Sequence, residues 1–443
     1  MKILTRLRTS GAIWMSPVCL GIILVYFFQS LHLDPGYTGM YTEPKWGPSV
    51  VSRVLIAYYA FSYAIASGLG AWEAGRLKRD GVWSLSAARS RYRIAAEALL
   101  PGVAAGWLML LIPLGMAFAE IGTWPTIDSL PLLGMGMILV CVHSIIGFAV
   151  GSRLNRIISA PLIAAVTYFL IGGSASRGET LWTRHLSGQF TAGLSFGEIA
   201  PLESLLPHIL FSGSIAAACC VAWISAWGQL MRIAIRITAA AACVGIMASC
   251  VAAVDSWGAV SPLASGHAAT ECRGTHPRVC APAAAHLDMK KTQREIAGAI
   301  TALREAGVDV PTPSTVNDSV VLGRVQRTST DRVWWMPVSK QAARGEETLR
   351  LAAVAHAVQF PCNRTDAVNS RSAMLWAATV AGADRPYLTW QKSEVQQYAN
   401  GDEVLEVVQR RVSTARKLSH AEQSAWYAKE IKKACTNAGK DGT

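Results

Sequence analysis

Seven long apolar segments in the first ~255 residues most constrain what this chain can fold into. A helix needs about 20 mostly apolar residues to cross the hydrocarbon core of a bilayer, and its backbone polar groups must be satisfied within the segment. Such segments lie at about 11–32, 49–72, 97–119, 131–151, 157–174, 207–228 and 234–254. The sequence therefore predicts an α-helical polytopic membrane domain of about seven helices.

Composition changes sharply after the last apolar segment. Only 16% of the 443 residues are charged, and the second part resembles an ordinary soluble protein. We therefore expect a transmembrane domain over residues 1–256 and a small α+β domain over residues 257–443. The first apolar segment is long for a signal peptide and no A-x-A-like cleavage site follows it, so we expect it to be retained as the first helix.

Lys and Arg gather on alternate connections between the apolar segments, which is the pattern of cytoplasmic loops. This bias predicts a cytoplasmic N-terminus and, with seven spans, an extracytoplasmic C-terminal domain. We expect a multi-pass protein of a bacterial inner (cytoplasmic) membrane. The net charge of +12 is then explained by contact with the lipid bilayer, and no motif for nucleic-acid binding is present. The clusters are Lys2, Arg6 and Arg8; Arg76, Lys78, Arg79, Arg89, Arg91 and Arg93; Arg153 and Arg156; and Arg232 and Arg236.

Six of the ten cysteines fall within the apolar segments, where cysteine acts as a small apolar residue. The other four, Cys272, Cys280, Cys362 and Cys435, are an even number in the domain expected outside, which fits a disulfide framework. Three pairings are open, and we favour Cys272–Cys280 with Cys362–Cys435. The rival interpretation is a zinc site, but no C-x-x-C spacing is present and we expect no metal.

The C-terminal part reads as mixed helix and strand. Helical spacing predicts helices over 283–307, 345–360, 370–381, 403–415 and 419–434, and short strands are expected over 320–325 and 332–338. His356 lacks the H-E-x-x-H pattern and no G-x-S-x-G elbow occurs, so we expect no catalytic residue and no cofactor. Trp334, Trp335 and Trp390 could form a binding surface, although packing in the core or against the membrane is favoured.

The longest basic loop, between the second and third apolar segments, has a distinctive pattern. Glu73 to Arg79 can extend the second helix, and Asp80-Gly81 ends it. A short apolar patch follows, and Ser90 can cap the third helix. The segment 175–206, near the opposite surface, is either a short re-entrant helix at the outer interface or an ordinary surface loop.

This arrangement resembles the membrane subunits of type-2 ABC exporters, in which a glutamate ends helix two, a short coupling helix follows and a Ser-Arg pair leads into helix three. The resemblance covers the first six segments, including the long outer segment 175–206; the seventh segment and the C-terminal domain depart from it. It implies a coupling loop that docks on an ATPase and a homodimer or heterodimer of membrane subunits. The implied coupling residues are Glu73, Arg76, Arg79, Trp83, Leu85, Ser90 and Arg91. The plainer alternative is a lipid-facing charge cluster.

Two functions are consistent with these features. The favoured one is a permease-like subunit of a type-2 ABC transporter, whose outer domain binds substrate or gates release. The sequence has no G-x-x-x-x-G-K-[ST] motif, so a separate ATP-binding subunit would hydrolyse ATP and this chain is not expected to be an enzyme. The alternative is a membrane-anchored sensor or interaction protein whose outer domain binds a ligand or an envelope partner. We expect structural roles for Arg53, His143 and His208 in the apolar segments.

Overall fold

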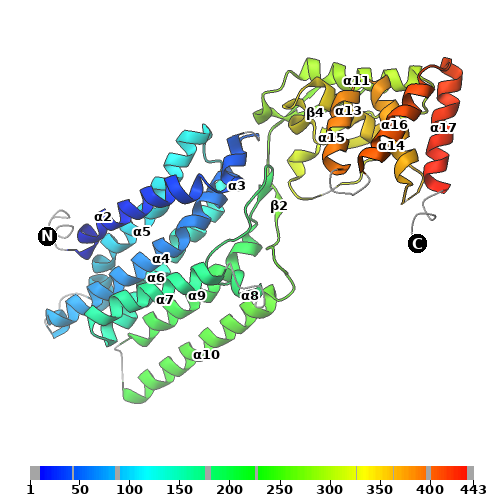
Figure 1. Ribbon diagram of the computed structural model, residues 1–443. Coiled ribbons are helices and arrows are strands. Elements are labelled where there is room, and N and C mark those ends of the chain that lie inside the picture. The colour runs from blue at the N-terminus through cyan, green and yellow to red at the C-terminus, as the bar shows by residue number, and fades with distance from the viewer. Residues whose placement is uncertain are drawn as a thin grey trace. The chain divides into compact units, whose positions relative to one another are not determined.

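The computed structural model describes residues 10–41, 44–84, 90–174, 181–224, 228–325, 327–362, 364–395 and 401–436. The chain divides into two compact units, Met1–His267 and Ala268–Thr443, called here the helical unit and the α+β unit (Figure 1). The division falls after residue 267, whereas we expected it after residue 256. The short strand β2 (Ala264–Ser265) pairs with β1 (Glu198–Ile199), which keeps residues 257–267 with the helical unit.

The helical unit contains seven helices that are long and apolar enough to cross a membrane, as the sequence predicted. Several are longer than expected, because polar residues at the ends of the apolar segments continue the helices. Two short helical pieces, α3 (Pro35–Thr38) and η2 (Gly39–Tyr41), follow the first span. The seven are α2 (Gly11–Val25) continued by η1 (Tyr26–Leu31), α4 (Gly47–Arg79), α5 (Arg91–Ile121), α6 (Leu130–Arg153) preceded by η4 (Ile127–Ser129), α7 (Arg156–Ser174), α9 (Leu202–Ala222) and α10 (Gln229–Val254).

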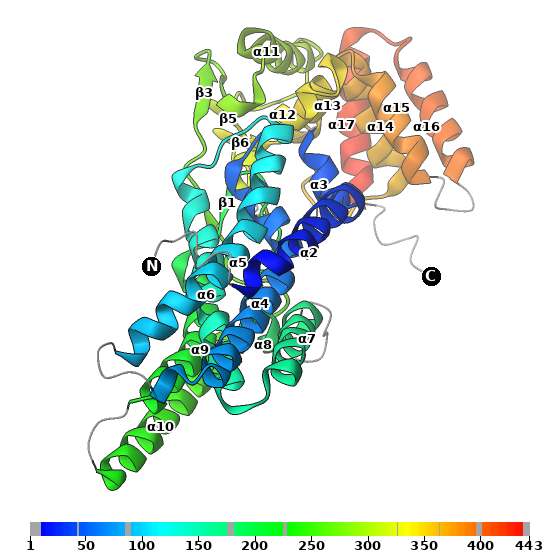
Figure 2. The same cartoon turned by 90° about the vertical axis from the view of Figure 1, so that its left-hand side faces the viewer.

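Helix α4 is the centre of this bundle and packs against α5, α6 and α7 (Figure 2). The side chains of Tyr58, Tyr59 and Tyr63 on α4 are fully buried. By contrast, α10 contacts mainly α9 and buries only Cys250 and Val254. The last span is therefore peripheral to the six-helix core.

Glycines bring α4 and α6 into backbone contact. A Cβ on Gly147 would lie 1.9 Å from the carbonyl oxygen of Ser67, and one on Gly151 would lie 2.2 Å from that of Ala71. These two glycines form a G-x-x-x-G pair, the spacing that lets membrane helices approach closely. On α4 itself, Gly70 meets the backbone of α6 in the same way, so the small-residue run 64–70 contributes to this packing surface.

The described residues of the α+β unit form a four-stranded sheet and seven α-helices. Its strands are β3 (Thr270–Arg273), β4 (Arg278–Pro282), β5 (Thr315–Asp318) and β6 (Val333–Met336), in that order; β3 and β4 are antiparallel and the other pairs are parallel. Trp334 and Trp376 are completely buried in its core. The helices are α11 (Met289–Glu305), α12 (Val338–Ala342), α13 (Glu346–Ala357), α14 (Ala367–Val380), α15 (Asp384–Val395), α16 (Gly401–Ala415) and α17 (His420–Thr436).

The expected strand over 320–325 is wrong. The strand in this region is β5, and the chain then turns into the 3-10 helix η6 (Ser319–Leu322). The cause is the buried Asp318 carboxylate, which accepts the backbone N–H groups of Val320 at 3.1 Å and Ser339 at 2.7 Å. Burial raises the pKa of Asp318, and these hydrogen bonds oppose that shift.

Two disulfides close the α+β unit. One joins Cys272 to Cys280 across the paired strands β3 and β4, and the other joins Cys362 to Cys435 in the last turn of α17. This is the pairing that we favoured among the three. The second bond connects residues 73 positions apart and so ties the last helix to the segment after α13.

Candidate functional site

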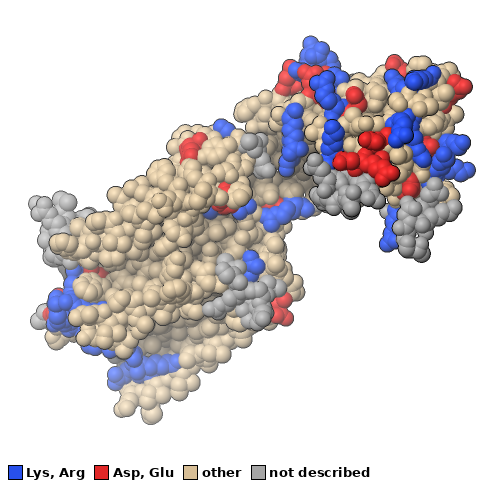
Figure 3. All heavy atoms as spheres, in the orientation of Figure 1, with Lys and Arg blue, Asp and Glu red and all other residues tan. Residues whose placement is uncertain are grey.

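Aromatic contacts bring three connections that are flanked by basic residues to one end of the helical unit; Arg232 and Arg236, expected in the last of them, lie inside α10. The Trp83 ring lies 5.3 Å from that of Trp223, which also contacts the rings of Tyr92 and Phe148. The Tyr92 hydroxyl donates to the Cys220 carbonyl at 2.7 Å. These residues belong to the ends of α4, α5, α6 and α9, so the connections that follow α4, α6 and α9 lie together. Figure 3 shows Lys and Arg gathered there, and we call it the basic end.

Glu73 lies inside the basic end and not on its surface. Only 3% of the residue is exposed. Its Oε1 accepts the Gly11 N–H at 3.0 Å, and its Oε2 lies 2.7 Å from Nη2 of Arg76. A carboxylate at a helix N-terminus satisfies a free backbone donor and interacts favourably with the helix dipole. Glu73 therefore fastens the start of α2 to α4 and can position the loop, but it cannot itself touch a docked partner.

The loop after α4 has the helix-ending and helix-capping residues that the sequence predicts. Helix α4 ends at Arg79, Asp80 caps it, and Gly81 follows with φ +63°. One turn of 3-10 helix, η3 (Val82–Ser84), comes next. Ser90 then caps α5 by accepting the Arg93 N–H at 3.2 Å. Leu85, which the resemblance placed in the coupling loop, lies outside the described residues.

An exposed polar surface surrounds η3. It consists of side chains from the end of α4, from η3 and from the start of α5, and we call it the loop surface. The Trp83–Trp223 contact holds η3 against the bundle, so this surface is presented on a fixed support. Arg76 is turned inward to Glu73 and does not belong to it. The members are Lys78, Arg79, Ser84, Ser90 and Arg91.

The segment 185–201, between α8 (Leu181–Arg184) and α9, is neither helical nor on the surface. The Leu194 N–H donates to Ser52 Oγ at 2.9 Å, and Gln189 Nε2 donates to the Ile56 carbonyl at 3.0 Å. The Tyr63 hydroxyl donates to the Gly188 carbonyl at 3.1 Å. At about 1.5 Å of rise per residue, these partners on α4 span roughly 16 Å. The segment therefore follows α4 to its middle, and for residues 185–201 both the short re-entrant helix and the ordinary surface loop are wrong.

A hydrogen-bonded group ties α2 to α5 away from the basic end. His32 Nδ1 lies 2.8 Å from the Phe27 carbonyl oxygen, and His32 Nε2 lies 2.7 Å from Glu120 Oε1. Both partners are acceptors, so the doubly protonated imidazolium satisfies both contacts. The Phe27 carbonyl and then the Glu120 carboxylate raise the pKa of His32. The Tyr37 and Tyr41 hydroxyls also donate to Glu120.

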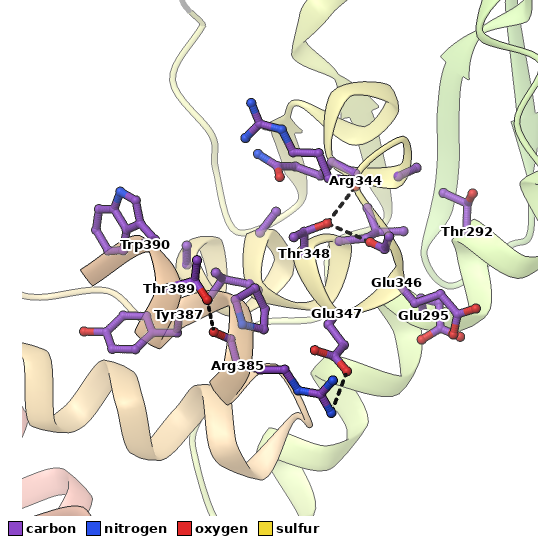
Figure 4. Close-up of a pocket in the computed structure, with 18 of the residues that line it drawn as sticks. Thr292, Glu295, Arg344, Glu346, Glu347, Thr348, Arg385, Tyr387, Thr389 and Trp390 are labelled. Atoms are coloured by element: carbon purple, nitrogen blue, oxygen red, sulfur yellow. Dashed lines mark hydrogen bonds and ion pairs between the residues drawn. The ribbon is translucent and has the colours of Figure 1, made fainter. Parts of the chain in front are cut away.

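A groove of about 1280 Å³ in the α+β unit runs beside α11, α13 and α15 (Figure 4). Ion pairs line it: Lys291 with Glu346 at 2.5 Å, and Arg385 with Glu347 at 3.7 Å. Hydrogen bonding from the Lys291 ammonium lowers the pKa of the Glu346 carboxyl. Apolar and aromatic side chains supply the rest of the lining, including Leu351, Ala352, Ala355, Met374, Tyr387 and Trp390.

Two side chains in the groove remain available to a ligand. Trp390 is 50% exposed, and Figure 4 shows it beside Tyr387. Arg344 also lines the groove and makes no ion pair with another described residue. Among the described residues there is no group of three or more His, Cys, Asp or Glu that could hold a metal ion. The arrangement suits non-covalent binding of a ligand with an apolar face.

No protein-family model, curated protein or solved structure matches this chain. The geometry brings Glu73 to Arg76 and places Trp83, Ser90 and Arg91 at one end of the unit. Sequence reasoning missed Trp223, the partner of Trp83. Its only signal was a tryptophan next to a basic connection, at the depth where aromatic residues anchor membrane helices.

Proposed function

We propose that this chain is a permease-like membrane subunit of a type-2 ABC transporter, working with a separate ATP-binding subunit. The observation that carries the proposal is the loop surface. It is basic and exposed, is built on η3 at the end of the most buried helix, and is held by the Trp83–Trp223 contact. A partner that docks on this surface would push on α4.

The packing around α4 supports this role. The Gly147–Ser67 and Gly151–Ala71 approaches couple α4 to α6 without intervening side chains. Closely packed interiors transmit displacement and do not absorb it. Movement of η3 would therefore reach the segment 185–201, which is hydrogen-bonded to the middle of α4.

The proposal includes an orientation and a location. We place the basic end in the cytoplasm of a bacterial cell and the α+β unit outside its cytoplasmic membrane. The convergence of the basic connections supports this under the positive-inside rule, and the two disulfides are typical of an oxidising compartment. The groove in the α+β unit would then bind substrate or gate its release. Two membrane subunits, identical or different, would form the transporter.

Charge reversal on the loop surface tests the ATPase partner. The full chain would be captured in mild detergent from cells that express the neighbouring genes, comparing wild type, Lys78→Glu with Arg79→Glu, and Arg232→Glu as a control. Arg232 is an exposed cation at the basic end but outside the loop surface. Because facing like charges cost several kcal/mol, we expect the double variant to lose captured ATPase by at least about tenfold and the control to retain it. Equal capture by all three, or a folded wild type with no ATPase in any detergent, would contradict the proposal.

The groove favours one second candidate. A volume of about 1280 Å³ with an exposed Trp390 suits a sensor or interaction protein whose outer unit binds a ligand or an envelope partner. Such a protein would be captured with that partner, and its capture would not depend on Lys78 or Arg79. The same experiment therefore separates the two functions.

A further inference from the structure

Tyr63, at the middle of α4, is where α4, α6 and the segment 185–201 meet. Its ring stacks on the His143 ring of α6 at 4.9 Å and 16°. Its hydroxyl donates to the Gly188 carbonyl, while the Gly188 N–H donates to Nδ1 of His208 on α9 at 3.1 Å. The backbone of one residue, Gly188, thus joins α4 to α9. Gly188 has φ +90°, and a Cβ there would crowd the Tyr63 ring at 3.3 Å.

Three polar atoms around this contact are buried and have no hydrogen-bond partner in the described part of the chain: His208 Nε2, His143 Nε2 and Gln189 Oε1. Because His208 Nδ1 accepts from Gly188, neutral His208 carries its proton on Nε2, which is an unused donor. Because Gln189 Nε2 donates to a carbonyl, its unused atom is the acceptor oxygen. Buried polar groups are nearly always paired, so three unpaired atoms on residues linked through Tyr63 and Gly188 need an explanation.

The chemistry of these atoms defines what could satisfy them. They comprise one donor, one acceptor and, in His143 Nε2, an atom that can serve as either. The groups holding them are peptide units and a phenol, all uncharged, and an ion at this depth in a membrane is costly. Non-helical backbone at membrane depth is tolerated where it is buried in protein or lines a water-filled cavity, and it forms binding sites in transporters.

We propose that His143, Gln189 and His208 form a binding site for an uncharged hydroxyl or amide group, supplied by water or by a solute that crosses the helical unit. Water and such a solute present the same donors and acceptors. The site would connect the segment 185–201 to α6 and α9 through the ligand. It stands independently of any ATPase partner.

Hydroxyl-radical labelling of the full chain in lipid nanodiscs tests the site, because this chemistry marks side chains that touch trapped water. Tyr58 is the internal control: it lies on the same helix, is also fully buried, and donates to the Ile23 carbonyl. We expect Tyr63 to be labelled several-fold faster than Tyr58 and His208 to be labelled detectably, because buried water makes hydrogen bonds to the polar groups that surround it. Labelling of Tyr63 no faster than that of Tyr58, together with no labelling of His208, both without added solute, would overturn the proposal.

Two additions identify the source of the ligand. Glycerol supplies hydroxyl groups and acetamide supplies an amide, and exposed Tyr41 corrects for scavenging of radicals. Protection of Tyr63 relative to Tyr41 would show that a solute enters the site, whereas no relative protection would assign the site to water. Both results support a site that binds this chemistry.

The variant His143→Phe keeps an aromatic ring against Tyr63 but replaces both imidazole nitrogens, including the unpaired Nε2, with carbon. If the site holds a ligand, Tyr63 labelling falls several-fold and the protein is not stabilised, because a bound contact is lost. If His143 is merely packed, Tyr63 labelling is unchanged and the melting temperature rises, because an unsatisfied polar atom has been removed. Unchanged Tyr63 labelling with a higher melting temperature would overturn the assignment of His143 to the site. The same result together with low labelling of Tyr63 and His208 in the wild type would overturn the site as a whole.

Discussion

A single methyl group at the α4–α6 crossing should destabilise the helical unit. In Gly147→Ala, the new Cβ would lie 1.9 Å from the Ser67 carbonyl oxygen. Comfortable contact between heavy atoms needs about 3.5 Å, so the two backbones must separate by roughly 1.5 Å. The obstacle is main chain in both helices, and neither can move aside as a flexible side chain would.

The magnitude follows from two opposed effects. Overpacking of a tight interior costs about 1–3 kcal/mol, and occasionally more. Replacing Gly with Ala inside a helix stabilises the helix by about 1 kcal/mol. Because the Gly147 clash is with backbone, we expect a net loss of about 2 kcal/mol or more. Gly134→Ala, on the same helix, is the matched control: nothing lies within 4 Å of its Cβ, so only the favourable effect applies.

Both variants can be compared with wild type in one detergent by heating and measuring the protein that stays monodisperse on size exclusion. Gly147→Ala should lower the melting temperature, while Gly134→Ala should leave it unchanged or raise it. If Gly147→Ala were as stable as wild type, or if the melting temperatures of both variants fell by the same amount, the close approach of α4 to α6 would be wrong.

Three further predictions concern other parts of the chain. Replacing Cys362 and Cys435 with serine should destabilise the α+β unit by up to about 4 kcal/mol, from the loop of 73 residues that the bond closes, with faster proteolysis as the readout; proteolysis at the wild-type rate would contradict this. Folding raises the pKa of His32. The stabilisation from the His32–Glu120 pair is therefore complete below about pH 6.5 and is lost as pH rises through the pKa of His32 in the folded protein. Because His32 and Glu120 are about a third exposed, His32→Gln should cost less than about 1 kcal/mol at pH 6 and nothing at pH 9, and an equal melting shift at both pH values would refute the pairing. Asp318→Ala leaves two backbone N–H groups without their acceptor and should cost about 2 kcal/mol in denaturant unfolding, whereas wild-type stability would show that the carboxylate does not organise this turn.

Features that depend on local sequence were predictable. Seven apolar runs became seven helices, because a bilayer-length helix is set by hydropathy alone. Asp80-Gly81 ended α4, and Ser90 capped α5, because turn and cap chemistry involves neighbouring residues. Cys272 and Cys280 were close in sequence and therefore easy to pair.

Features that depend on distant residues were not predictable. Glu73 is buried because it meets Gly11, 62 residues away, and no local pattern shows that meeting. The strand β5 was misplaced because its ladder partners, β4 and β6, are remote in sequence, while the turn after it is fixed by an N–H at Ser339. The unpaired atoms of His143 and His208 were invisible for the same reason, since both residues looked like ordinary packing within apolar helices.

The most direct test of the central claim is photo-crosslinking from Ser84, an exposed residue of η3, in native membranes. A photoreactive amino acid at this position would be activated in cells that express the neighbouring genes, and the adducts would be identified by mass spectrometry. The account predicts a crosslink to a cytoplasmic protein that carries a G-x-x-x-x-G-K-[ST] motif. Adducts with lipid alone, or with a protein on the outer side of the membrane, would contradict it.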